Sequence, residues 1–148
     1  MAGKRFKLAT RGVGNYFDTN HVGRGAAYGD LDNDGDIDLV INHKDGPPAL
    51  LLNETITENR WLRLVLVGTK SNRDAIGTRV EVEIPRRIIY RQRKGGASMF
   101  STSDPRLNIG VGPNETVSKI TIRWPSGQVQ VLENVATNAE VKIIEPKE

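Results

Sequence analysis

The chain has 148 residues, a net charge of +3 and no cysteine, which excludes disulfide frameworks, thiolate zinc sites and cysteine nucleophiles. Hydrophobic residues make up 37% and aromatic residues 5% of the chain, a composition typical of a β protein with one ordinary core. No apolar run approaches the length of a membrane span, and no hydrophobic region follows the basic opening residues, so we expect neither a transmembrane segment nor a signal peptide in this chain.

The charge is distributed unevenly along the chain. Residues 1–24 carry +4, residues 25–58 carry −7 and residues 59–148 carry +6. A dense acidic segment in a basic protein indicates a cation site rather than a nucleic-acid-binding surface. Residues 1–23 show no clear periodicity, and we expect them to form a loosely structured lead-in.

The acidic segment 30–38 reads Asp-Leu-Asp-Asn-Asp-Gly-Asp-Ile-Asp, with carboxylates at loop positions 1, 3, 5, 7 and 9 and glycine at position 6. Calcium prefers six to eight oxygen ligands, which acidic side chains alternating along a tight turn can supply. Glycine permits the sharp bend that brings the first positions over the ion. We therefore predict that Ca²⁺ is bound by the side chains of Asp30, Asp32, Asp34 and Asp38 and by the main-chain carbonyl of Asp36.

This loop differs from an EF-hand, which requires a bidentate glutamate at position 12, because Ile41 stands there. The apolar run at 39–41 predicts an outgoing strand instead of a helix. A solvated acidic turn is the alternative, although five neighbouring carboxylates repel one another strongly without a counter-ion. Magnesium is disfavoured because it takes fewer and stiffer ligands.

Alternation of apolar and polar residues predicts an all-β fold. Residues 24–58 offer short strands at 37–42 and 49–53, too few to bury a core alone. In 61–67 the leucines share one face, and Trp61, Arg63 and two valines share the other. Half-buried strands are also predicted at 78–84 and 117–124. Further strands are expected at 86–93, 97–102, 128–133 and 140–144.

Turn-forming residues separate these strands. Proline and glycine in 124–127 predict a tight turn that joins two strands as a hairpin, and the alternation places Trp124 in the core. The glycines and proline of 110–114 predict a break in regular structure. Residues 59–148 therefore indicate a compact antiparallel sandwich or barrel.

Two parts of the chain resemble known modules. Residues 24–54 (RGAAYGDLDNDGDIDLVINHKDGPPALLLNE) resemble one FG-GAP/VCBS-type β-propeller repeat with its calcium loop. Residues 60–146 resemble the ASPIC/UnbV domain of cartilage acidic protein-like secreted proteins, through NRWLRLVLVG (59–68), SNRDAIGTRVEV (71–82), LNIGVG (107–112) and ITIRWPSG (120–127). The resemblance implies a lead-in at 1–23, a repeat at 24–58 and a β domain at 59–148, located outside the cytoplasm.

A propeller needs several blades, and this chain holds one blade-like unit, whose open strand edges demand a partner. We therefore expect the chain to be the C-terminal piece of a longer protein, with missing upstream blades or a second copy covering those edges. The family resemblance implies an unidentified extracellular protein or glycan as ligand.

Three other features allow functional interpretations. The basic run Arg86, Arg87, Arg91, Arg93 and Lys94 can contact an acidic polysaccharide or form a solvated strand rim, which is the simpler interpretation. The segment 72–74 can ligate a sugar or cation, or shape its own turn. His21 and His43 show neither a nucleophile motif nor metal-ligand spacing, so a turn role is expected for His43.

The leading hypothesis is a non-catalytic extracellular recognition or adhesion module in which calcium is structural. A carbohydrate-binding accessory domain of a larger secreted protein is the alternative. A calcium-dependent hydrolase is a third hypothesis, disfavoured because the clustered carboxylates are better used as ligands and no separate acid–base pair is visible.

Overall fold

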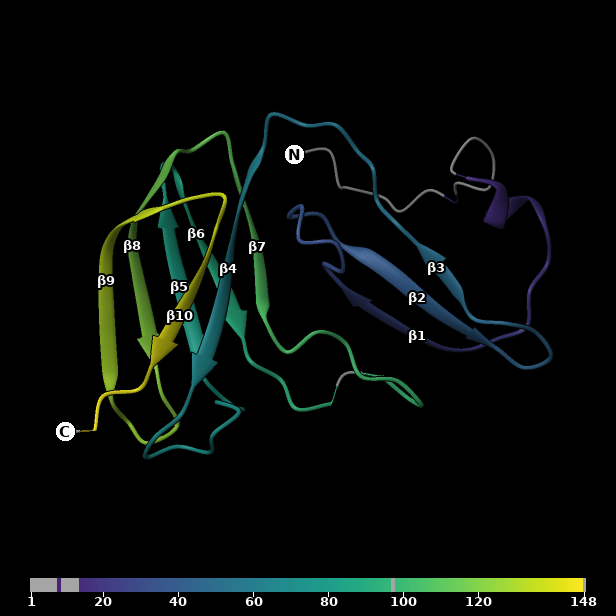
Figure 1. Cartoon of the computed structure of the whole chain (residues 1–148). Helices are drawn as coiled ribbons and strands as arrows, with labels where there is room; N and C mark the ends of the chain where they lie inside the picture. The colour runs from purple at the N-terminus through teal and green to yellow at the C-terminus, as the bar shows by residue number, and fades with distance from the viewer. Residues whose placement is uncertain (1–7, 9–13, 97, 148) are drawn as a thin grey trace.

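The computed structural model of this protein describes residues 8, 14–96 and 98–147 and contains three β-sheets. The sheets form two parts that lie next to each other, a small sheet built from the first strands and a two-sheet sandwich built from the rest (Figure 1). Most of the predicted lead-in, residues 1–7 and 9–13, lies outside the described residues; the part that follows contains a short 3₁₀ helix, Asn15–Asp18. No helix in the described part of the chain has the length and apolarity to cross a membrane.

The first sheet is antiparallel and has the strand order β1-β2-β3. Its strands are β1 (Gly23–Gly29), β2 (Asp38–His43) and β3 (Ala49–Leu51). The acidic loop connects β1 to β2, so the predicted strand–loop–strand arrangement is confirmed. The strand predicted at 49–53 is shorter than expected and ends at Leu51.

The sandwich consists of a three-stranded sheet, β10-β4-β7, and a four-stranded antiparallel sheet, β6-β5-β8-β9. Its strands are β4 (Arg60–Val67), β5 (Arg79–Ile84), β6 (Arg87–Gln92), β7 (Leu107–Gly112), β8 (Thr116–Arg123), β9 (Val129–Ala136) and β10 (Ala139–Ile144). The sheets stay separate throughout the described residues, which makes the fold an all-β sandwich rather than a barrel.

Aliphatic side chains from both sheets fill the space between them. Leu62 and Leu64 of β4 are fully buried against Val82 of β5 and against Ile120 and Ile122 of β8. These are the side chains that alternation predicted to face inward, and each buried residue of this size contributes about 1.5–3 kcal/mol relative to an exposed one. The inward face of the sandwich is therefore confirmed.

The predicted hairpin turn also forms as expected. The main-chain N–H of Gly127 donates to the carbonyl of Trp124 at 3.0 Å, and the N–H of Trp124 donates to the carbonyl of Gln128 at 2.9 Å. Trp124 is 3% exposed and belongs to the core, as predicted.

Three expectations were wrong. The 110–114 segment does not break the sheet at its start: β7 stays paired with β4 as far as Gly112, with a register shift between Gly110 and Gly112, and Ile109 and Val111 are buried. Residues 98–102 form no strand and make only a single bridge, Ser98 to Ser101, while residue 97 lies outside the described residues. The sandwich is not purely antiparallel, since β10 pairs with β4 in parallel.

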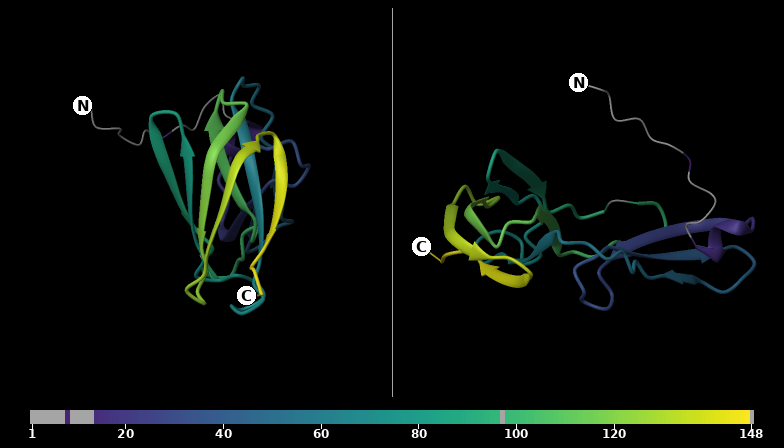
Figure 2. Two further views of the ribbon diagram at one scale, coloured as in Figure 1. Left: turned by 90° about the vertical axis from the view of Figure 1, so that its left-hand side faces the viewer. Right: turned by 90° about the horizontal axis from the view of Figure 1, so that it is seen from above.

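The segment after β6 joins the two parts of the molecule. Ser101 Oγ donates to the carbonyl of Ala26 at 2.7 Å, and the N–H of Asp104 donates to the carbonyl of Tyr28 at 2.9 Å. The N–H of Tyr28 in turn donates to Ser103 Oγ at 3.3 Å. This segment follows the otherwise open edge of β1, and the small sheet extends away from the sandwich (Figure 2).

Candidate metal centre

The acidic loop reverses the chain between two paired strands. Gly29 and Asp38 are register partners at the ends of β1 and β2, so Asp30 and Asp38 begin the two sides of the loop. Asn33 and Gly35 have positive φ, at 66° and 100°, and complete the reversal. The φ of 100° at position 35 suits glycine, because residues with a β-carbon adopt this conformation only with strain.

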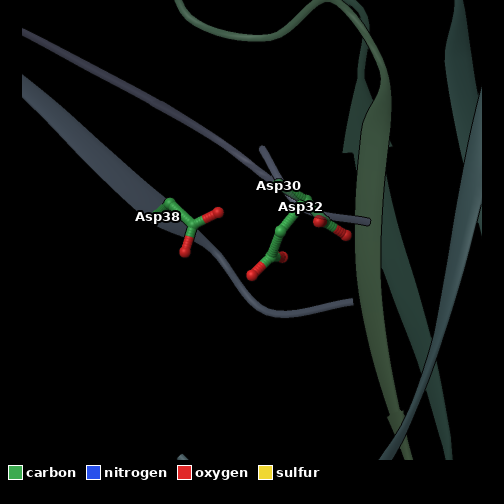
Figure 3. A group of neighbouring side chains, drawn as sticks. All are labelled: Asp30, Asp32 and Asp38. Atoms are coloured by element: carbon green, nitrogen blue, oxygen red, sulfur yellow. The ribbon is translucent and has the colours of Figure 1, made fainter. Parts of the chain in front are cut away.

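Three of the four carboxylates predicted as ligands converge. Asp30, Asp32 and Asp38 each present a carboxylate oxygen, and these oxygens lie within 4.8 Å of one another (Figure 3). The carboxylate of Asp34 lies outside this group, and Asp36 was predicted to bind through its main-chain carbonyl instead. The Asp34 Oδ1 atom instead accepts a hydrogen bond of 2.8 Å from the N–H of Asp36, which forms a local turn.

Two of the converging carboxylates are buried, since Asp30 and Asp38 are each 1% exposed. Asp38 is fully paired, because its oxygens accept hydrogen bonds from the N–H groups of Leu31 at 2.7 Å and Asn53 at 2.9 Å. In Asp30, Oδ2 accepts from the N–H of Gly35 at 2.8 Å, but Oδ1 is buried and lacks a hydrogen-bond partner among the described residues. An unpaired buried carboxylate oxygen is costly, and a hard cation at this position would satisfy it. The donor set therefore fits calcium.

The carboxylates of the loop repel one another. Burial raises the pKa of the Asp36 carboxyl, and the negative charges of Asp34, Asp38 and Asp32 raise it further. Such repulsion disfavours the charged form of each acid, and a bound divalent cation reverses it.

A buried arginine from the sandwich contacts the loop. Arg63 of β4 is 2% exposed and forms an ion pair with Asp30. Its Nη1 donates to Asn33 Oδ1 at 2.9 Å, and its Nε donates to Asn108 Oδ1 at 2.9 Å. The alternation placed Arg63 on the face of β4 away from the leucines. On that face the acidic loop covers Arg63, so its side chain is buried rather than solvated.

Trp61 packs in the same place. Its ring lies 4.9 Å from the Arg63 guanidinium, close enough for a cation–π contact. A β-carbon built on Gly35 would overlap the Trp61 indole, so the loop and β4 are in close contact.

A second arginine contacts the loop from the segment before β7. Arg106 Nη2 donates to the carbonyl of Asp30 at 2.9 Å, and Nη1 donates to Asn33 Oδ1 at 3.3 Å. The guanidinium also pairs with Asp104 at 2.7 Å. Burial opposes ionisation of Asp104, but the hydrogen bonds and charge of Arg106 outweigh it and lower the pKa of that carboxyl.

Sequence reasoning found the acids of this site and missed its basic partners. Arg63, Arg106 and Asn33 are isolated polar residues without a motif, and a long stretch of chain separates the two arginines from the loop. One signal was available: Arg63 interrupts the most apolar strand of the chain, which is typical of an arginine with a buried acidic partner.

The other candidate residues form local structure. The Asn72 side chain donates to the carbonyl of Ile76 at 2.9 Å and accepts from its N–H at 2.8 Å, which supports the turn interpretation of that segment. His43 does more than form a turn, because its ring stacks on that of His21 at 5.0 Å and its Nε2 lies 2.9 Å from the hydroxyl of Tyr16.

Comparison with known proteins identifies relatives for most of the chain. The sequence model of the family described as ASPIC and UnbV matches residues 68–148, which leaves the acidic loop outside the match. The chain is 29% identical to cartilage acidic protein 1 of Xenopus tropicalis, over 72% of this chain and 17% of that protein. It is 27% identical to cartilage acidic protein 1 of Homo sapiens, over 85% of this chain and 20% of that protein. The chain thus spans a fifth or less of the length of these relatives.

Proposed function

The chain belongs to the ASPIC and UnbV family, and from that premise we propose that it is a non-catalytic, calcium-stabilised module that serves recognition or adhesion outside the cytoplasm. The observation that carries the calcium part is the buried, unpaired Oδ1 of Asp30 beside the converging carboxylates of Asp32 and Asp38. The similarity to the cartilage acidic proteins supports the extracellular part.

The proposed ligands are the side chains of Asp30, Asp32, Asp34 and Asp38 with the carbonyl of Asp36. Asp34 is exposed and outside the converging group, so its side chain would have to change rotamer to bind the ion. Side-chain and main-chain oxygens in this number suit calcium better than magnesium.

Calcium would stabilise the junction between the two parts of the molecule. The loop that would bind the ion is the same loop that Arg63 and Arg106 hold against the sandwich. Fixing the loop therefore also fixes the position of β1 and β2 relative to β4. Extracellular calcium modules bind with Kd of about 10⁻⁴–10⁻³ M, which suits a permanently filled structural site.

Residues 24–58 are proposed to be one FG-GAP/VCBS-type propeller repeat. Three antiparallel strands around an acidic loop support this assignment. Upstream blades in a longer protein, or a second copy of this chain, would then pack against it.

Thermal unfolding with calcium and with chelator tests the proposal. A ligand that binds only the folded state stabilises it by roughly 1.4 kcal/mol at ten times its Kd. For a chain of this size that corresponds to a rise in Tm of roughly 4 °C. We expect this rise in the parent and not in Asp34→Ala, with a smaller response to magnesium at the same concentration.

Asp45→Ala provides the matched control, because Asp45 is an exposed acid in the connection between β2 and β3, outside the acidic loop. This variant should respond to calcium as the parent does. An equal Tm with calcium and with chelator in the parent would show that the loop binds no calcium in this chain, and the calcium proposal would fail.

A further inference from the structure

A groove lies where the small sheet meets the sandwich. Its volume is about 460 Å³. Its walls come from the end of β6, the segment 102–108, Tyr28 of β1 and Ile37 of the acidic loop. The part of the predicted basic run that reaches it is Arg91, Arg93 and Lys94; Arg86 and Arg87 lie outside its lining.

Three of the basic side chains that line the groove have no acidic partners among the described residues. Within residues 8, 14–96 and 98–147, Arg91, Arg93 and Lys94 form no ion pair. In the described part of the chain, the guanidinium groups of Arg91 and Arg93 donate only to main-chain carbonyls, those of Tyr90 and Lys94.

The acid in the groove lining is not available to these cations. Asp104 is engaged by Arg106, whose Nε donates to both of its carboxylate oxygens at 2.8 and 3.0 Å. The groove therefore presents net positive charge toward any ligand.

A second hollow of about 280 Å³ shares Arg93, Pro105 and Arg106 with the groove. Its lining adds Arg73 and Lys142, together with the acid Asp74. The positive surface therefore continues beyond the groove and suits an extended ligand with repeated negative charges.

Two tyrosines line the groove beside the cations. Tyr28 is 50% exposed and Tyr90 is 65% exposed, so both offer aromatic surface to a ligand. An aromatic ring with a polar hydroxyl accepts the apolar face of a sugar and hydrogen-bonds its edge. Guanidinium groups recognise sulfate and carboxylate groups through paired N–H donors.

We propose that this groove binds an acidic polysaccharide, whose sulfate or carboxylate groups pair with Arg91, Arg93 and Lys94 and whose sugar rings rest on Tyr28 and Tyr90. The proposal names the ligand class for the recognition role proposed above and rests on that role. It does not require that the ligand contact calcium.

The test is calorimetric titration of the whole chain, with calcium present, against four probes. These probes are a heparin oligosaccharide, an oligogalacturonate, a dextran oligosaccharide and single-stranded oligo(dT). We expect the sulfated or the uronate probe to bind, with an affinity that falls as salt rises, and the neutral dextran not to bind. The first two probes distinguish sulfate from carboxylate recognition.

Matched double variants locate the site. Arg91→Gln with Arg93→Gln should weaken binding by at least about tenfold, because both charge-assisted hydrogen bonds to the ligand are lost. Arg86→Gln with Arg87→Gln removes the same charge from the same run outside the groove and should leave affinity within about twofold. Tyr90→Ala should weaken binding several-fold without changing Tm.

Equal losses in the two double variants would overturn the groove assignment in favour of a diffuse basic surface. Tighter binding of oligo(dT) than of either acidic glycan would overturn the ligand class, as would no binding of any glycan at low salt. In each case an intact calcium response of Tm would show that the failure belongs to the groove and not to the calcium site.

Discussion

Glu145 is the most completely hydrogen-bonded acid of the sandwich. It is 1% exposed, and its Oε2 accepts from the main-chain N–H groups of Thr69, Lys70 and Ser71 at 2.8–3.0 Å. The hydroxyls of Ser71 and Ser126 donate to Oε1 at 2.8 and 2.5 Å. The side chain thus joins the segment after β10 to the loops that follow β4 and β8.

These contacts make stability depend on pH through Glu145. Burial opposes its ionisation, but the hydrogen bonds from Ser126, Ser71 and Thr69 outweigh burial and lower its pKa from 4.5 to about 2. A folded-state pKa below the unfolded value gives stability that is present above pH 4.5 and is lost as pH falls toward 2. The loss amounts to at most about 3–4 kcal/mol.

Glu145→Gln tests this dependence. We expect the variant to be less stable than the parent at neutral pH and the difference between them to vanish as pH falls below the folded pKa. Urea unfolding of both proteins at several pH values measures it, and other carboxylates cancel in the difference. Parallel stability curves for the two proteins would contradict the role assigned to Glu145.

At the residue scale, a group of functional side chains could be predicted from the sequence where its members are neighbours in the chain. The acids of 30–38 are adjacent, so their repulsion and ligand capacity follow from the printed order. Glu145 and Arg63 have partners far along the chain. The apolar strand around Arg63 signals a buried acidic partner without identifying it, and Glu145 carries no such signal. Folding, rather than sequence proximity, brings Arg63 and Arg106 to the acidic loop and forms the pocket around Glu145.

At the scale of elements, the acidic loop is held as a unit against strand β4. Gly35 has φ of 100°, and the space where its β-carbon would lie is occupied by the indole of Trp61. Gly127, in the turn between β8 and β9, has a similar φ of 93° but open space around it. A substitution at Gly127 therefore measures the cost of the backbone conformation alone. The same substitution at Gly35 adds the cost of the contact with Trp61.

Gly35→Ala should lower stability by about 2–3 kcal/mol and weaken the calcium response, because the loop must move away from Trp61. Gly127→Ala should lower stability by about 1 kcal/mol, the cost of the backbone conformation alone, and leave the calcium response intact. Chemical unfolding with and without calcium measures both effects. Equal losses in the two variants would show that the contact with Trp61 contributes nothing.

Most strands were predictable because one face of each packs on the core and the other is polar. The strand β7 escaped prediction because a glycine follows each of its two buried residues, Ile109 and Val111, and these glycines are typical of a turn. Burial of alternate side chains outweighed that tendency. The parallel pairing of β10 with β4 was not predictable either, since alternation specifies which face of a strand is buried and not which strand lies beside it.

At the scale of the whole molecule, the small sheet has apolar side chains on both faces. Tyr28, Leu39 and Leu51 are register partners and share one face; Ala27, Val40 and Leu50 share the other. Tyr28 lines the groove beside the sandwich. On the opposite face, Val40 is 37% and Leu50 58% exposed. A sheet that is apolar on both faces is typical of a layer between two others.

We therefore predict that the isolated chain associates with itself through the face formed by Ala27, Val40 and Leu50. In a longer protein a neighbouring blade would cover this face, and in the isolated chain a second copy is the available cover. Leu50→Lys should weaken association about tenfold or more, since it places a charge on apolar surface that the predicted association buries. Val131→Lys, which changes an exposed valine of β9 in the sandwich, is the matched control and should leave association unchanged. Sedimentation velocity over a range of concentrations measures both variants. If the parent stays monomeric at every concentration, this apolar face is stable when exposed to solvent. The prediction that a second copy or a neighbouring blade covers it would then be wrong.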